Sequence, residues 1–220
     1  MRRPFLALLL ALAVLPLHAG RAQIIRGGGR FTMKDPQLWI SGGVGWQQGW
    51  SVDDGSTGSR WDLSDATSYG LSVERALTGG TTLALRGSTA RVPLNYVFTH
   101  DGGVTSSAQA DGNVSQAFLG IHVSSGRDLH SVLELGAGAT MYSGFKQRNT
   151  GEPLPPDKVD ADFAFVFGYG LGYSFSRSFQ VDVVQDLATS LHQKAGLTAG
   201  QTSSSRLSGT RLVARYGFGS

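Results

Sequence analysis

The sequence contains no cysteine. Its absence excludes disulfide bonds, cysteine-ligated zinc sites, thiol catalysis and a lipid anchor on cysteine. Charged residues are also scarce, at 16 %, but aromatic residues reach 10 %, which argues against a disordered chain. After the first 22 residues no apolar run approaches the roughly 18 residues of a membrane-spanning helix. A transmembrane helix is therefore not expected in that part of the chain.

The positive charge of the chain is concentrated at its start. The formal net charge is +3, and the first 22 residues hold three arginines and no acidic residue. The rest of the chain has 16 of the 19 Lys and Arg residues against 16 Asp and Glu residues, so its formal net charge is zero. The positive charge is therefore no reason to expect nucleic-acid binding.

Residues 1–22 have the organisation of a Sec signal peptide. A basic start is followed by the 13-residue apolar run Phe5–Leu17, and then by small residues at Gly20 and Ala22. A 13-residue helix spans about 20 Å, which is short of a hydrocarbon core of ~30 Å and argues against a membrane anchor. We predict cleavage before Gln23.

Beyond the signal peptide, apolar residues alternate with small or polar ones at a period of two, which is typical of β-strands. In the clearest run, 161–175, apolar and mostly aromatic residues occupy the odd positions, and glycine or other small or polar residues occupy most even ones. We predict eight strands from this pattern. The other seven runs are 38–47, 69–74, 83–86, 116–123, 133–141, 179–184 and 211–218.

The predicted connections alternate strictly between short and long. The short ones are Leu77–Gly80, Ser125–Asp128 and Phe175–Ser178, and the long polar ones lie around 51–64, 98–112, 147–158 and 193–205. Short turns on one side, long loops on the other and an even strand number are typical of an up-and-down transmembrane β-barrel. We therefore predict an all-β, eight-stranded antiparallel barrel with periplasmic turns and extracellular loops.

The alternative is a secreted soluble β-barrel or sandwich. It would point the aromatic residues inward and expose Gly168, Gly170 and Gly172, where glycine weakens a strand without a compensating gain. With the aromatic residues outside, these glycines face a narrow lumen instead. The membrane barrel is therefore preferred. Its predicted membrane-facing aromatic residues are Phe163, Phe165, Phe167, Tyr169, Tyr173, Phe175, Tyr216 and Phe218.

Charged residues of both signs fall on the opposite, inward face of the predicted strands. The interior polar network comprises Glu74, Arg86, His122, Glu134, Asp182, Asp186, Arg211 and Arg215. Buried charges are costly unless paired, so we predict a salt-bridge network that plugs the lumen. Asp182 is expected to pair with Arg211 or Arg215 on the neighbouring strand. A narrow pore or transporter for small solutes remains the alternative, although a lining of mixed sign disfavours conduction.

The signal peptide, the strand run Val159–Phe175, the alternation of connections and the closing segment Arg211–Phe218 resemble the outer-membrane β-barrel domain superfamily. Its small eight-stranded members include OmpA-type, OmpX-type and opacity-protein-like barrels. The resemblance implies a location in the outer membrane of a Gram-negative bacterium. It also implies contact with lipid and lipopolysaccharide, and assembly by the barrel-assembly machinery.

Such barrels usually end in an aromatic residue that the assembly machinery recognises, whereas Gly219 and Ser220 follow Phe218 here. The predicted organisation is a signal peptide over 1–22, a flexible periplasmic lead over 23–36 and the barrel over 37–220. We expect a monomer.

A candidate catalytic set for lipid A ester chemistry is Asp186, Ser190 and His192. Ser190 and His192 are two residues apart on one strand face, about 7 Å, which is too far for a direct hydrogen bond. We therefore predict no enzymatic activity, no cofactor and no metal site. His192 is expected at the barrel rim, with His100 and His130 in a loop and a turn.

The four tryptophans suggest aromatic girdles at the membrane interfaces. Trp46, Trp50 and Trp61 surround the first long connection, and Trp39 begins the first strand. Sugar binding by Trp50 and Trp61 is an alternative. For the whole protein we expect a role in envelope integrity or in interaction through surface loops. The alternatives are solute transport and, less favoured, lipid A modification.

Overall fold

The structure is a computed structural model that describes residues 35–54, 58–99, 105–126, 128–156, 158–192 and 203–219. The predicted signal peptide, all but the last two residues of the predicted lead, and His100 lie outside the described residues. In the described ranges, no helix has the length and apolar character needed to cross a membrane.

The described ranges contain ten strands. They are β1 (Leu38–Gln47), β2 (Trp50–Asp54), β3 (Ser59–Leu63), β4 (Ala66–Thr78), β5 (Thr81–Thr99), β6 (Thr105–Gly126), β7 (Leu129–Gln147), β8 (Asp160–Ser176), β9 (Phe179–His192) and β10 (Ser203–Phe218).

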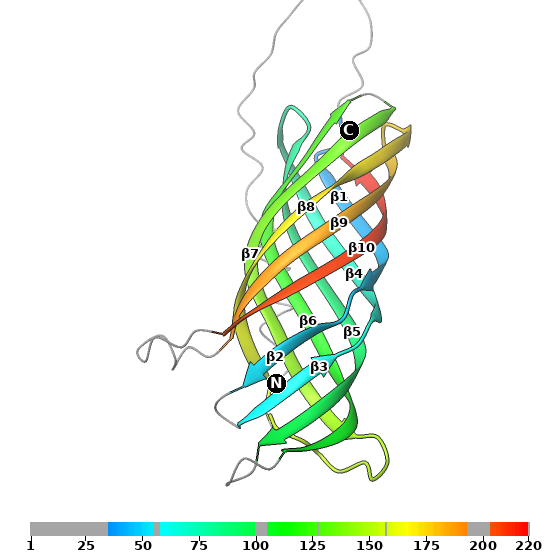
Figure 1. Cartoon of the computed structure of the whole chain (residues 1–220). Coiled ribbons are helices and arrows are strands. Elements are labelled where there is room, and N and C mark those ends of the chain that lie inside the picture. The colour runs from blue at the N-terminus through cyan, green and yellow to red at the C-terminus, as the bar shows by residue number, and fades with distance from the viewer. Residues whose placement is uncertain are drawn as a thin grey trace, which may run out of the picture. The chain divides into compact units, whose positions relative to one another are not determined.

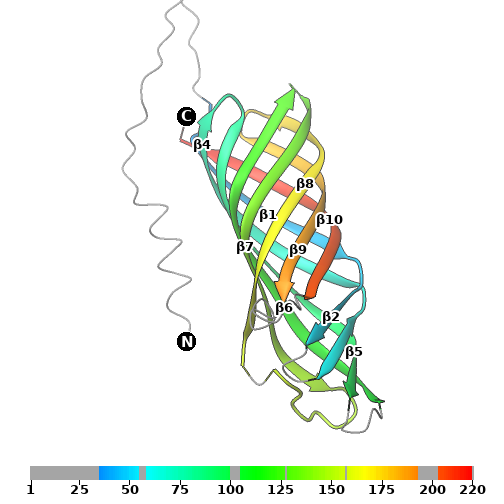
Figure 2. The ribbon, with the colours of Figure 1, turned by 60° about the vertical axis from the view of Figure 1, so that its left-hand side comes forward.

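Eight of these strands form a closed antiparallel ring, in the order β1-β4-β5-β6-β7-β8-β9-β10 (Figures 1 and 2). The ring closes where β10 pairs with β1, from Leu38 opposite Phe218 to Gln47 opposite Gly209. This confirms the predicted eight-stranded barrel. We call the end with the three short turns the turn end, and the opposite end the loop end.

The first predicted long connection, 51–64, is wrong as a loop. It folds into the hairpin β2–β3, whose second strand pairs with β5 from Ser59 opposite Phe98 to Leu63 opposite Leu94. The hairpin thus continues the wall beyond β1 and β4. The predicted loop 98–112 is likewise mostly strand, since β5 runs to Thr99 and β6 starts at Thr105. Strands of 19 to 22 residues exceed the roughly 9–11 needed to cross a bilayer.

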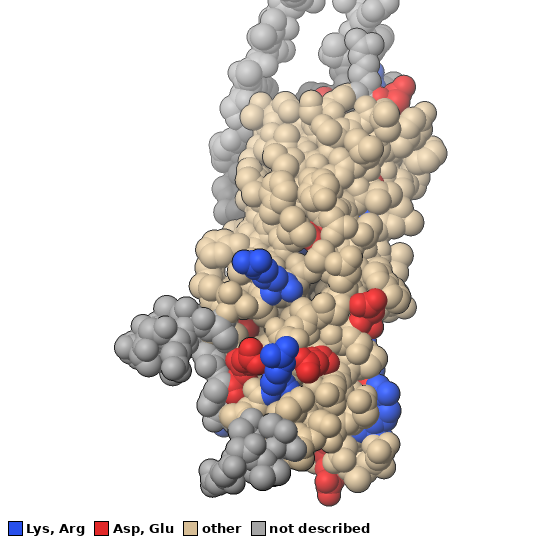
Figure 3. Space-filling model, viewed as in Figure 1, with Lys and Arg blue, Asp and Glu red and all other residues tan. Residues whose placement is uncertain are grey.

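The outer face towards the turn end is apolar. Along β8 the odd-numbered residues point outward, so that Phe165 is 52 % exposed, whereas Ala164 beside it is fully buried. All eight predicted membrane-facing aromatic residues are exposed, between 39 % and 65 %. In Figure 3 this part of the surface, at the top, is almost free of charged side chains, whereas charged side chains gather lower down.

The interior is divided into two parts. The polar half, towards the turn end, holds the predicted interior network of charged residues. The aromatic half, towards the loop end, is a core around Trp61, Tyr96, Tyr142 and Phe145. Only the polar half fits the predicted small and polar interior. The prediction is wrong for the aromatic half, because the extended wall there encloses a hydrophobic core of its own.

Candidate functional site

The polar half contains a central ion cluster. Arg86 Nη1 lies 3.1 Å from Glu134 Oε2 and 3.2 Å from Asp186 Oδ2. Arg211 donates to Asp186 Oδ2 at 2.9 Å and also pairs with Glu134. His122 Nδ1 lies 2.9 Å from Glu134 Oε1. Five side chains from β5, β6, β7, β9 and β10 therefore meet across the lumen.

A second cluster lies nearer the turn end. Arg215 donates to Glu74 Oε2 at 2.5 Å and to Gln180 Oε1 at 2.7 Å. Thr82 Oγ1 also donates to Glu74 Oε2, at 2.7 Å. Asp182 lies 3.7 Å from Arg215 Nη1, so Arg215 rather than Arg211 is its arginine partner.

The structure brings all eight residues of the predicted interior network into the lumen, with side chains that are at most 19 % exposed. It adds His130, which is not in a turn as predicted. His130 is buried on β7 and its Nε2 lies 3.0 Å from Asp182 Oδ1. The even-numbered residue Glu134 of β7 points inward. The same alternation, continued through Val132 to His130, predicts an inward side chain for His130 as well.

Glycines make room for these clusters. A Cβ atom on Gly172 would lie 2.0 Å from Asp182 Oδ1 and 2.3 Å from His130 Nε2. A Cβ atom on Gly168 would lie 2.9 Å from Asp186 Oδ1. Glycine on the inward face of β8 is thus required by the close approach of the ion-paired side chains.

The aromatic half is organised around Trp61, which is fully buried. The centre of its ring lies 4.9 Å from that of Phe145 and 5.4 Å from that of Tyr142, both in edge-on contacts. The Tyr96 ring lies 6.5 Å away. Such pairs add to the stabilisation from burial alone.

The predicted tryptophan girdle is wrong for three of the four residues. Trp61 and Trp50 belong to the aromatic half, because the hairpin β2–β3 turns them inward. Trp39 is buried in the polar half, where the Arg215 guanidinium lies 4.9 Å from the centre of its ring. Only Trp46, at 53 % exposed, lies on the outer face.

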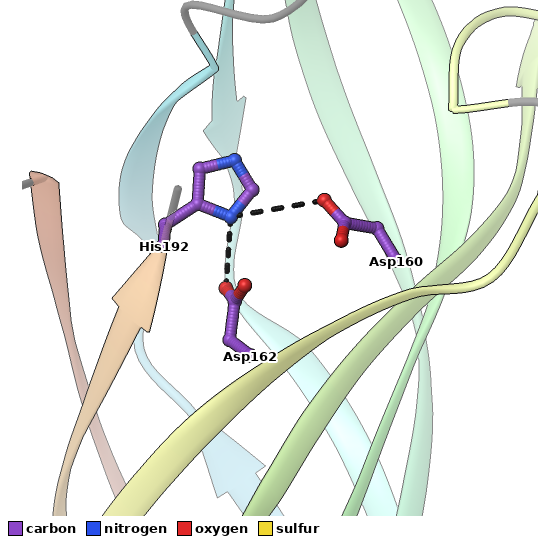
Figure 4. A group of neighbouring side chains, drawn as sticks. All are labelled: Asp160, Asp162 and His192. Carbon is purple, nitrogen blue, oxygen red and sulfur yellow. Dashed lines mark hydrogen bonds and ion pairs between the residues drawn. The ribbon is translucent and has the colours of Figure 1, made fainter. Parts of the chain in front are cut away.

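A third cluster lies at the loop end (Figure 4). His192, predicted at the rim, is instead buried, and its Nδ1 lies 2.9 Å from Asp162 Oδ2 and 3.9 Å from Asp160 Oδ2. On the other side of the ring, Nε2 lies 3.9 Å from Asp54 Oδ1. The position of Asp54 depends on β2, which lies in a segment that the sequence predicts as a loop.

The candidate catalytic set is not assembled. The Ser190 hydroxyl is hydrogen-bonded to Ser205 Oγ at 2.6 Å, and the carboxylate of Asp186 pairs with Arg86 and Arg211. His192 pairs instead with Asp162 on β8. The three side chains therefore serve three separate contacts.

The outer surface of the hairpin is charged. Arg60 Nε lies 2.8 Å from Asp62 Oδ1, and Ser51 donates to the same oxygen at 2.6 Å. The hydrogen bonds from Ser51 and Arg60 lower the pKa of Asp62. Arg148 Nη2 also lies 2.7 Å from Asp111 Oδ1, towards the loop end of the barrel.

Adjoining cavities of about 60 Å³ and about 30 Å³ lie beside the central ion cluster, and both are lined by Arg86 and Arg211. A cavity needs roughly 10–15 Å³ of space for the centre of a water-sized sphere to hold one water molecule. The cavities therefore suit a few water molecules between the ion pairs and the wall.

Comparison with known proteins supports the fold. OprG, an outer-membrane protein of Pseudomonas aeruginosa, is 12 % identical, with a TM-score of 0.53 over 85 % of this chain and 98 % of OprG. Neisserial surface protein A is 7 % identical, with a TM-score of 0.53 over 82 % of this chain and 97 % of that one. Models of protein families and curated proteins give no match. The chain therefore has the fold of the small eight-stranded barrels of bacterial outer membranes.

Proposed function

We propose that the chain is a small integral protein of the bacterial outer membrane, closed to solutes, that acts in envelope integrity or surface interaction. Its turn end would face the periplasm and its loop end the outside. The observation that supports this is the filling of the lumen at two successive levels, by ions in the polar half and by rings in the aromatic half.

In the polar half, ion pairs close the lumen. Three arginines meet four carboxylates in the polar half, with two histidines in contact with the carboxylates. Parting such buried partners leaves unpaired charge and costs several kcal/mol, roughly 3–5 for one lost partner. The clusters therefore resist opening by thermal motion.

The second level closes by packing. Trp61, Tyr96 and Tyr142 are fully buried, and Phe145 is 1 % exposed. Because their rings come from β3, β5 and β7, they span the lumen from several sides of the wall. Among the described residues, a water-filled path between these strands would have to displace an aromatic side chain.

The apolar outer face towards the turn end supports the membrane location. Leu71, Tyr69 and Phe175 are 71 %, 64 % and 65 % exposed on the outer face. An apolar surface of this extent would be unfavourable in contact with water but is satisfied by contact with lipid. Lipid and lipopolysaccharide are thus the proposed surroundings, with delivery by the barrel-assembly machinery. We propose a monomer, because the eight-stranded ring is closed by its own strands.

The interaction role rests on the loop end. The hairpin β2–β3 and the extended β5 to β7 form a continuous wall with charged pairs such as Arg60–Asp62 on its outer surface. A rigid, charged surface of this kind suits binding of a partner outside the cell. We propose a binding role rather than an enzymatic one.

Ion conductance in planar lipid bilayers tests the closed lumen. The protein inserted in 1 M KCl should give no steady conductance above that of the bilayer alone. Phe145→Ala opens only the aromatic half, and Glu134→Ala disturbs only the polar half, so each single variant should also stay silent. The double variant should conduct.

Stable single-channel steps from the unaltered protein would overturn the proposal and support the narrow, porin-like pore. Conductance by one single variant would show that one level alone closes the lumen. Retention of heat-modifiable migration on gels verifies that each variant keeps its barrel.

A further inference from the structure

The cluster at the loop end has a composition unlike that of the polar half. Asp160 and Asp162 lie on β8, and His192 lies at the end of β9; one ligand atom of each lies within 4.8 Å of the others (Figure 4). Among the described residues, His192 alone forms an ion pair with these two carboxylates. In the polar half, by contrast, three arginines accompany four carboxylates. The loop-end cluster therefore has an excess of negative charge.

Two buried polar atoms without a hydrogen-bond partner in the described part of the chain lie in this cluster or next to it. Thr140 lies directly opposite Asp162 in the β7–β8 ladder, is fully buried, and its Oγ1 has no partner. His192 Nε2 also has none, although His192 is only 2 % exposed. Buried polar groups are nearly always satisfied, and each exception calls for an explanation such as an ion.

We propose that Asp160, Asp162 and His192 bind a divalent transition-metal ion of the Zn²⁺ type. One imidazole nitrogen and carboxylate oxygens are ligands that Zn²⁺ accepts, at about 2.0–2.2 Å each. Tetrahedral ligands at that radius lie about 3.3–3.6 Å apart. The present separations from His192 Nδ1, 2.9 Å and 3.9 Å, bracket that spacing.

The nitrogen ligand also sets the metal class. Mg²⁺ and Ca²⁺ prefer oxygen-only ligand sets, whereas imidazole suits Zn²⁺ and its neighbours among the transition metals. Thr140 Oγ1, next to Asp162, offers an oxygen for a further ligand or for a metal-bound water.

Asp54 completes the arrangement from the far side of the imidazole. A metal-bound histidine commonly donates its other N–H to a carboxylate, which fixes the orientation of the ring. With the metal on Nδ1, His192 Nε2 carries that N–H, and Asp54 Oδ1 lies 3.9 Å away. A shift of about 1 Å would form the hydrogen bond. The otherwise unsatisfied Nε2 thus has a role in the metal-bound form.

An ion can reach this site from the outside. The Asp160 side chain is 40 % exposed, whereas those of Asp162 and His192 are at most 3 % exposed. Asp160 would therefore take up the ion first and pass it to the two buried ligands. The inference is independent of whether the lumen conducts.

Isothermal titration of the detergent-solubilised protein with ZnCl₂ after chelator treatment tests the proposal. We expect one Zn²⁺ per chain, with weaker binding of Ca²⁺ and Mg²⁺. Asp160→Asn, Asp162→Asn and His192→Gln should each weaken binding tenfold or more, since each removes a ligand atom. Zn²⁺ should also raise the unfolding temperature of the unaltered protein but not of these variants.

Asp53→Asn is the matched control. Asp53 is the acidic residue next to Asp54 on β2, and its side chain is 66 % exposed. It should bind Zn²⁺ as the unaltered protein does. Asp160→Asn is the variant least disturbing to folding, given the exposure of Asp160. The proposal would be overturned by absence of stoichiometric Zn²⁺ binding, or by a preference for Ca²⁺. It would also be overturned if Asp160→Asn and Asp162→Asn bound Zn²⁺ as tightly as the unaltered protein does.

Discussion

The polar half and the aromatic half show one barrel wall used in two opposite ways. Towards the turn end the outer face carries exposed leucine, phenylalanine and tyrosine, while the inner face carries Glu134, Arg211 and their partners. Towards the loop end the outer face carries Arg60 and Asp62, while the inner face carries Trp61 and Phe145. The polarity of the wall is reversed along the barrel axis.

This reversal follows from the proposed surroundings of each half. In lipid, the apolar side chains of the wall face outward and contact the lipid. The lumen then does not need a hydrophobic core and can hold paired charges. In water, the extended wall behaves like a soluble protein and needs a hydrophobic core. The comparison implies that stability has different physical origins in the two halves.

The largest expected effect is in the polar half. Glu134→Ala removes a partner of both Arg86 and Arg211 and leaves buried positive charge. We expect a loss of about 3–5 kcal/mol in the free energy of unfolding, measured by urea titration in lipid vesicles. A loss below about 1 kcal/mol would show that water reaches these arginines and that the polar half is not closed.

A slightly smaller effect is expected in the aromatic half. Leu94→Ala removes a side chain that is 1 % exposed and packed in the hydrophobic core. The cavity should cost about 2–4 kcal/mol in the same urea titration. Leu71→Ala is the control, because Leu71 is 71 % exposed on the outer face. Equal effects of the two variants would contradict a core at the loop end.

Hydrogen bonds should also matter more in the polar half. Thr82→Val keeps the shape of the side chain but removes the hydroxyl that donates to Glu74 Oε2 at 2.7 Å. We expect a loss of about 1–3 kcal/mol in unfolding free energy, because a charged acceptor loses a donor. An unchanged midpoint would mean that Arg215 and Ser72, the other donors to Glu74 among the described residues, satisfy this carboxylate without Thr82.

The smallest effect is expected from the matching change in the aromatic half. The hydroxyl of Tyr96 is buried and has no hydrogen-bond partner in the described part of the chain. Tyr96→Phe should therefore leave the free energy of unfolding within about 0.5 kcal/mol, or raise it. A loss as large as that of Thr82→Val would reveal a polar partner in the aromatic half.

Strand β8 shows how much of the fold could be predicted from the sequence. Its odd positions are apolar and mostly aromatic and its even positions are mostly small or polar, so each side chain could be assigned to a face without knowledge of its neighbours. The same parity assigned Glu134, Asp182 and Arg215 to the interior. Which carboxylate meets which arginine depends on ladder register and barrel closure, which are not visible in one strand at a time.

The hairpin β2–β3 shows where prediction from the sequence failed. Its strands have five residues each and are rich in serine and aspartate, so the short-range pattern resembled a loop. Without this hairpin, the sequence predicts Trp61 at the membrane interface and His192 at the rim. Both are buried because a distant segment covers them.

The strand periodicity and the two faces of the long strands follow from the sequence alone, because alternation is a local property of the chain. The filling of the lumen by charge at one end and by rings at the other follows from the fold. The fold also decides that Asp160, Asp162 and His192 meet. These contacts join residues far apart in the chain, and closure of the wall brings them together.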